Sequence, residues 1–222
     1  MTSTDAPPAD ASDNATPRRR SLAESVGATA SRLQQQYLST VDDRAKTRAR
    51  GVLAELRRGA GASPLSQPLI AQRVLMELDP PLDEGLIGHG DDFSPSERAA
   101  FDALTLFALH MQSATRPVHV RQRSFGAAAG ILYRHDASSK SIKPRVDALL
   151  SARDHASRLT HARSLITLMR SRDIGFDYGR FAQDLRALSG PKRAGVLLRW
   201  GRDFATPPRT STDSPSSTLA AS

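Results

Sequence analysis

Cysteine is absent from this chain of 222 residues, which excludes disulfides, thiolate nucleophiles and zinc sites built on cysteine. Long apolar runs are absent too, because no stretch approaches the roughly 18 residues that cross a bilayer. Residues 1–17 are mostly small and polar and lack the apolar segment of a secretory signal. We therefore expect a cytoplasmic protein that does not interact with membranes.

Catalytic and metal-binding motifs are also missing. The sequence has no His-Glu-x-x-His, no glycine-rich phosphate loop, no Gly-x-Ser-x-Gly and no carboxylate cluster of nuclease type. The acidic segment 79–92 matches no calcium-loop spacing, so a solvated loop is expected there. His155 and His161 would lie roughly 120° apart around one helix, which requires a third ligand from elsewhere. We predict no catalytic residue, no metal site and no cofactor.

Strand-like alternation is lacking, whereas helical periodicity runs through most of the chain. The clearest local signal is Ser94-Pro95-Ser96-Glu97, which has the residues of a capping box with proline at the first helical position. The helix that it begins should end before Arg116-Pro117. The other predicted helices span residues 22–38, 42–58, 64–78 (a short helix within this stretch), 124–132, 144–152, 154–170, 177–188 and 192–204.

The predicted fold class is all-α, a two-lobed helical bundle with disordered N- and C-terminal tails. Residues 1–20 and 207–222 are polar, proline-containing tracts that cannot bury enough apolar surface to become ordered. The N-terminal helical lobe is placed at 21–115 and a basic C-terminal helical lobe at 116–206.

Charge is distributed unequally between these lobes. Residues 21–115 carry nine basic and twelve acidic residues, whereas residues 116–206 carry eighteen basic and seven acidic residues. The asymmetry indicates a face directed at a polyanion. Only four of the 31 basic residues are lysines, which fits a GC-rich genome, but such a bias does not explain the difference between the halves.

The basic residues favour capture of phosphate groups. Lys192 and Arg193 begin a predicted helix, where free N–H groups attract a phosphate. Arg163 and Arg170, seven residues apart, share one helical face. Arginine binds phosphate with parallel donors and gives affinity without reading bases. Aromatic residues are few and mostly lie on apolar faces, which indicates core packing rather than base stacking. The alternative is a solvated face with intrahelical ion pairs such as Asp154 with Arg158.

A series of short motifs occurs in a fixed order between residues 42 and 205. They are Leu53–Gly59 with its Leu-Arg-Arg sequence, Phe101–His110, Ser124–Gly126, Leu149-Leu150, Leu159–Leu168, Phe176–Leu185, Pro191–Arg193 and Arg199–Phe204. Together they resemble the CasB family, the small subunit of the type I-E CRISPR effector complex Cascade. The tails and the acidic segment 79–92 depart from the family pattern.

The resemblance implies an all-α subunit that is not the nuclease. It would pack against the backbone and large subunits and a second copy of itself, near the guide RNA and target DNA. Its basic groove would guide target DNA and stabilise the displaced strand of the R-loop. Strand exchange is nearly balanced in energy, so modest backbone contacts can tip it.

The predicted nucleic-acid-binding residues combine the family positions with the charge pattern. They are Arg98, Arg123, Lys143, Arg145, Arg153, Arg163, Lys192, Arg193 and Arg199. Arg57 and Arg58 match the Leu-Arg-Arg motif and are left open as either structural or binding residues.

Three other functions are considered. A structural helical adaptor would bridge protein subunits without contacting nucleic acid. A helix-turn-helix regulator would need an exposed recognition helix beside a tight turn, which is not evident. A hydrolase would use the histidines and the acidic loop, and would show metal-dependent cleavage.

Overall fold

The computed structural model describes residues 21–136 and 140–208. Within these ranges the chain forms nine α-helices, two short 3-10 helices and a single β-bridge between His119 and Phe176. The predicted all-α class is therefore confirmed. No helix in the described ranges has both the length and the apolar character needed to cross a bilayer. The elements are α1 (Leu22–Leu38), α2 (Asp43–Arg57), η1 (Pro64–Ser66), α3 (Pro68–Glu77), η2 (Glu84–Leu86), α4 (Pro95–His110), α5 (Phe125–His135), α6 (Ile142–Ser151), α7 (His155–Arg170), α8 (Tyr178–Leu188) and α9 (Arg193–Ala205).

Side-chain caps account for where most helices begin. The capping box predicted at the start of α4 is present, with the Ser94 side chain accepting from the N–H of Glu97. A second capping box, which was not predicted, begins α1 at Ser21. Aspartate caps α2, α7 and α8, and Ser124 caps α5. These contacts are local, which explains why the predicted bounds of α1, α2, α7 and α8 agree within two residues. The bounds of α6 and α9 agree as well, although these helices begin without a side-chain cap.

Two predicted helices end at other residues than expected, whereas the short helix predicted within 64–78 is present as α3, which begins at Pro68 after η1. Helix α5 continues to His135, three residues beyond its predicted end at Leu132. Helix α4 ends at His110 rather than just before Arg116. Met111 caps it, and Ser113 takes a positive φ of 60° that turns the chain away.

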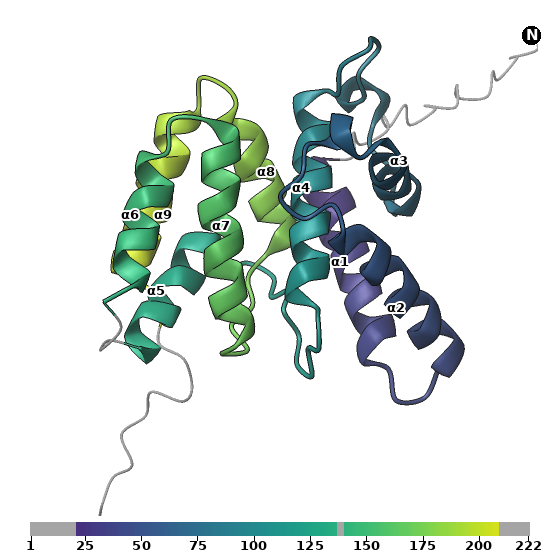
Figure 1. Cartoon of the computed structure of the whole chain (residues 1–222), viewed down its shortest axis with the longest axis horizontal. Helices are drawn as coiled ribbons and strands as arrows, with labels where there is room; N and C mark the ends of the chain where they lie inside the picture. Colours follow the sequence, from purple (N-terminus) through teal and green to yellow (C-terminus); the bar gives the residue numbers. More distant parts are fainter. Residues whose placement is uncertain (1–20, 137–139, 209–222) are drawn as a thin grey trace, which may run out of the picture.

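The helices form two groups that are joined through α8. Figure 1 shows α1–α4 on one side and α5, α6, α7 and α9 on the other, with α8 between them. Helix α8 packs mainly on α1 and α4, although it also contacts α9. The buried apolar residues of both groups belong to one continuous cluster. The division into two lobes at 115/116 stays a proposal. Helix α8 follows this boundary in the sequence but packs mainly on α1 and α4, which precede it.

The predicted tails lie largely outside the described residues. Pro207 and Pro208 are the exception, since their carbonyls accept hydrogen bonds from the Arg134 guanidinium. The first two residues of the predicted C-terminal tail are therefore hydrogen-bonded to α5.

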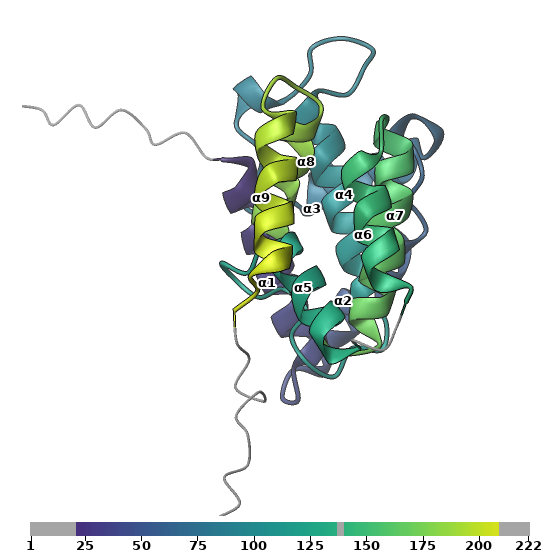
Figure 2. The same ribbon diagram turned by 90° about the vertical axis from the view of Figure 1, so that its left-hand side faces the viewer.

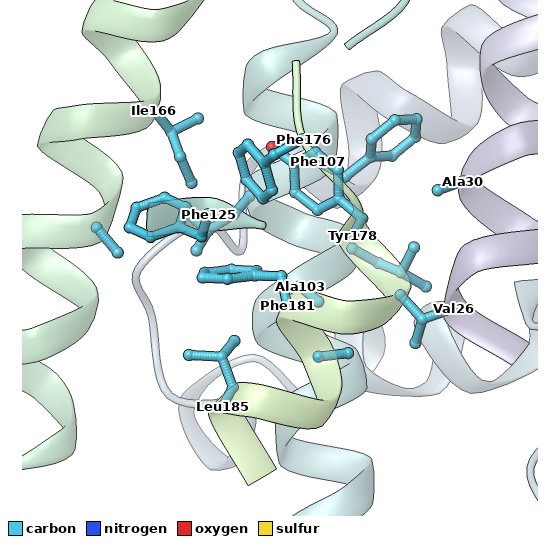
Figure 3. Packing of buried hydrophobic residues seen from close by; sticks show 14 of the residues in the cluster. Val26, Ala30, Ala103, Phe107, Phe125, Ile166, Phe176, Tyr178, Phe181 and Leu185 are labelled. Carbon is cyan, nitrogen blue, oxygen red and sulfur yellow. The ribbon is translucent and has the colours of Figure 1, made fainter. Parts of the chain in front are cut away.

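Aromatic side chains fill the centre of the core. Phe125, Phe176, Tyr178 and Phe181 pack together, with ring centroids 4.3 Å apart for Phe176 and Tyr178 (Figure 3). Trp200 of α9 joins them, with its ring 5.2 Å from Phe125. The prediction that most aromatic residues serve the core is confirmed, since none of those described is fully exposed.

One histidine is enclosed in this aromatic core. His110 has no exposed surface, and its Nδ1 lies 2.9 Å from the Tyr178 hydroxyl. Burial, and secondarily the charge of Arg170, lowers the pKa of His110 to about 3. Burial also lowers the pKa of His119, whose Nδ1 accepts from the Tyr178 N–H. Both imidazoles are therefore neutral parts of the core.

Acid should destabilise the fold through His110. Its pKa is 6.5 when unfolded and about 3 when folded, so the unfolded state binds the extra proton in between. The stability that neutral His110 contributes to the fold is fully present above the unfolded pKa of 6.5. It falls by about 1.4 kcal/mol per pH unit as the pH decreases through this window. Urea unfolding of the unchanged chain and of His110→Asn at several pH values measures this slope. The variant is expected to be less stable but to have the shallower slope; equal slopes would contradict the prediction.

Candidate nucleic-acid interface

Two arginines share one backbone carbonyl at the end of α6. The Ala152 carbonyl accepts from Nη2 of Arg158 in α7 and, at 2.8 Å, from Nη2 of Arg193 at the start of α9. Arg158 is buried at 3% exposure, and its pKa is lowered by burial and next by the charge of Arg193. Neither guanidinium forms an ion pair with a described carboxylate. The charge of Asp154 acts on Arg158 in the opposite direction to burial and Arg193, but it forms no ion pair with it, so the two adjacent cations leave a positive potential at this corner.

Exposed cations surround this corner. Arg153 follows Ala152, and Lys192 precedes Arg193. Lys192 and Arg186 also line a cavity of about 350 Å³, which the start of α4 and the turn between α8 and α9 enclose. We call Arg153, Arg158, Arg186, Lys192 and Arg193 the basic end. Figure 2 shows that α9 and α7 both begin at this end of the bundle.

A second group of ionisable side chains lies where α7 faces α4. Arg98, Asp102 and His155 line a cavity of about 160 Å³ together with the loop at 61–64. His155 Nε2 lies 2.7 Å from Asp102 Oδ2. Burial raises the pKa of Asp102, although its bond to His155 and the charge of Arg98 act in the opposite direction. Arg163 extends over the same loop, since a Cβ atom on Gly61 would lie 3.3 Å from its Nη1.

Two predicted binding residues instead hold the fold together. Arg199 Nη2 lies 2.8 Å from Oδ1 of Asp184, a nearly buried carboxylate in α8. Arg123 Nη1 donates to the Gly175 carbonyl at 3.1 Å, and burial lowers the pKa of Arg123. These contacts join α9 to α8 and the segment before α5 to the segment before α8. We therefore leave Arg199 and Arg123 out of the proposed interface.

Two further predicted residues lie on α6. Lys143 pairs with Asp147 at 2.7 Å, and this hydrogen bond followed by the carboxylate charge raises the pKa of Lys143. Arg145 donates to the Ser164 hydroxyl and to the Ser141 carbonyl. Both belong to the first turn of α6, whereas Ala152 follows its last turn. The nine predicted residues therefore do not form one stripe, and only Arg153, Lys192 and Arg193 meet at the basic end.

Arg158 and Arg186 belong to the basic end but are not among the predicted binding residues. The sequence places Arg158 near the basic face of Arg163 and Arg170, with an ion pair to Asp154 as the alternative. In the structure both oxygens of Asp154 accept from Ser157, which lowers the pKa of Asp154, and Arg158 turns to Ala152. Basic residues at both ends of a short interhelical turn were the available signal, but they do not reveal which side chain is buried.

The described residues offer no candidate metal centre, because no group of three or more His, Asp or Glu side chains is arranged to hold an ion. His110 and His119 are core residues, and His155 is bonded to Asp102. The hydrolase alternative therefore gains no support from their placement.

The fold and this surface define an all-helical protein with a concentration of unneutralised arginine and lysine at one end. The family model described as CRISPR-associated protein Cse2 matches residues 52–204, and the chain belongs to this family. The resemblance to CasB seen in the sequence is thereby confirmed. A search of curated proteins found no matching sequence.

Solved structures share the fold. CasB from Thermobifida fusca is 28% identical with a TM-score of 0.63, over 83% of this chain and 98% of that one. A Cse2-family protein from Thermus thermophilus is 24% identical with a TM-score of 0.56, over 82% of this chain and 97% of that one. A chain of a CRISPR RNA-guided surveillance complex is 21% identical with a TM-score of 0.57, over 83% of this chain and 94% of that one. The last two likenesses concern the fold alone.

Proposed function

We propose that this chain is a non-catalytic small subunit of an RNA-guided CRISPR surveillance complex of the Cascade type. Its basic end would hold nucleic-acid backbone without reading sequence, guiding target DNA and stabilising the displaced strand of the R-loop. Family membership supports the assembly, in which the backbone and large subunits, a second copy of this chain and the guide RNA would be neighbours. The observation that carries the DNA contact is the pair of guanidinium groups on the Ala152 carbonyl, neither of which forms an ion pair with a described carboxylate.

The chemistry of the basic end suits phosphate. Arg153 and Lys192 are exposed beside the two arginines, and α9 begins without a side-chain cap on its first N–H groups. The absence of fully exposed aromatic rings among the described residues argues against base stacking. Contacts of this kind supply affinity that depends on salt but not on sequence.

Removing two of these charges tests the proposal. The double variant Arg153→Gln/Lys192→Gln should bind single-stranded DNA about tenfold more weakly, and its salt slope should fall by about 0.7 for each lost cation. Fluorescence anisotropy with labelled oligonucleotides of different sequence at two salt concentrations measures both quantities. Arg116→Gln/Arg121→Gln is the matched control, because these exposed arginines lie in the segment that follows the opposite end of α4.

The outcomes distinguish DNA binding at the basic end from an effect of net charge on affinity. Equal losses in the two double variants would show an effect of net charge alone, and losses confined to one sequence would contradict backbone capture. Absence of binding by the unchanged chain even at low salt would reject the proposal.

A structural adaptor remains the second candidate because α3 exposes an apolar face. Leu69 and Met76, seven residues apart and so on one side of the helix, are 76% and 71% exposed, and Leu65 is 53% exposed. Large apolar side chains grouped in this way are typical of protein contacts. If the chain were only an adaptor, the variants at the basic end would leave DNA affinity unchanged.

A further inference from the structure

Helix α2 concentrates positive charge in the half of the chain that is acidic on average. Six of the nine basic residues of 21–115 fall within α2 and its C-cap residue, 43–58, against two carboxylates, Asp43 and Glu55. Glu55 pairs with Arg73 of α3 at 3.5 Å. The six cations therefore have no carboxylate partner among the residues that the structure describes; they are Arg44, Lys46, Arg48, Arg50, Arg57 and Arg58.

Three of these cations share one side of α2. Lys46, Arg50 and Arg57 lie within about 40° of one another around the helix axis, next to the buried side. Arg50 and Arg57 line a cavity of about 330 Å³ between α2 and the C-terminal end of α4, together with Tyr37 and Gln112. The guanidinium carbon of Arg50 lies 6.0 Å from the centroid of the Tyr37 ring, which holds the side chain over the aromatic face.

This cavity and the basic end lie at opposite ends of α7. Gln112, which lines the cavity, accepts from Arg170 Nη1 at 2.7 Å in the last turn of α7. Arg158, in the first turns of the same helix, belongs to the basic end. Arg163 lies between them and extends over the loop that follows α2. Figure 1 shows α4 between α7 and α2, and α4 contacts both of these helices.

We infer that the face of Lys46, Arg50 and Arg57 is a second phosphate-binding surface. A nucleic-acid strand that is bound at the basic end runs along α7 and binds this surface as well. The inference rests on the proposed function, because both surfaces share one ligand. Helix α7 has 16 residues and is about 24 Å long. That length corresponds to about seven nucleotides in a strand stacked at roughly 3.4 Å each, and to about four in an unstacked strand that extends about twice as far per nucleotide. A strand of fewer than about four nucleotides is therefore too short to occupy both surfaces.

The test uses a matched pair of variants on one helix. Lys46→Gln/Arg50→Gln removes two charges from the proposed surface, and Arg44→Gln/Arg48→Gln removes two from a side of α2 about 160° away. Anisotropy titrations of the whole chain with oligo-dT of about 20 and about three nucleotides measure affinity. For the longer strand the first variant should bind with about tenfold lower affinity, and its salt slope should fall by about 1.4. The second variant should change the affinity by less than about twofold. For the shorter strand the unchanged chain and both variants should bind alike.

Each outcome decides the inference separately from the proposed function. Equal losses in the two α2 variants, or no loss in either, overturn the second surface, while a loss in Arg153→Gln/Lys192→Gln still supports the basic end. A loss confined to Lys46→Gln/Arg50→Gln supports α2 and rejects the basic end. Absence of oligonucleotide binding by the unchanged chain rejects both. Because these side chains lie on the surface of α2, the urea midpoint should not move, which separates lost binding from lost folding.

Discussion

Replacing Gly179 with alanine is expected to lower the free energy of unfolding by about 3 kcal/mol. Gly179 lies in the first turn of α8, where this helix crosses α1. A Cβ atom there would lie 2.3 Å from the Ala23 carbonyl oxygen and 3.1 Å from the Cα of Gly27. These are backbone atoms that cannot rotate away, so the two helices must separate. Their separation would loosen the aromatic core around the neighbouring Tyr178, and urea unfolding followed by Trp200 fluorescence measures the loss.

Gly51→Ala is the control for this prediction. Gly51 is exposed in α2, and no atom lies within 4 Å of the position that its Cβ would take. Alanine is the better helix former, so this variant should gain about 0.5–1 kcal/mol. If Gly179→Ala were as stable as Gly51→Ala, the close crossing of α1 and α8 would be wrong.

The sequence predicted helices better than it predicted their packing. Ser94 and Glu97 mark the start of α4 by contacts within one turn, and such signals can be read from neighbouring residues. The close crossing of α8 over α1 depends on Gly179 lying against the carbonyl of Ala23, 156 positions earlier in the chain. No local pattern marks two such residues as partners. The same limit explains why the sequence could not show that α8 packs mainly on α1 and α4.

The interface was only partly predictable for a similar reason. Summing charge over 21–115 concealed α2, because acidic residues elsewhere in that segment cancel the six cations of α2 and its C-cap residue. The helical period placed Arg199 on a basic face, but it could not show that Asp184 of α8 would lie opposite it. Lys192, Arg193 and Arg153 were predictable because the turns that carry them are short. The shared acceptor, the Ala152 carbonyl, is visible only in the folded chain.

The joint between α8 and α9 depends on the carboxylate of Asp184. Its Oδ2 accepts from the indole N–H of Trp200 at 2.7 Å, and its Oδ1 accepts from Arg199. Asp184→Ala would leave the Trp200 N–H without an acceptor inside the core. It would also release a guanidinium from its only described carboxylate. We expect a loss of about 3 kcal/mol in the free energy of unfolding, measured by urea denaturation, because unsatisfied buried donors are costly.

Arg199→Gln separates the two interactions of Asp184 and tests whether Arg199 belongs to the interface. The Arg199 side chain is 49% exposed, so solvent screens its ion pair and the loss of stability should be about 1 kcal/mol or less. The bond from Trp200 to Asp184 remains, which should keep α9 against α8. DNA affinity should then stay near that of the unchanged chain, since this guanidinium is already neutralised. A loss per charge comparable to that of Arg153→Gln/Lys192→Gln would show that Arg199 exchanges Asp184 for phosphate, and would return it to the interface.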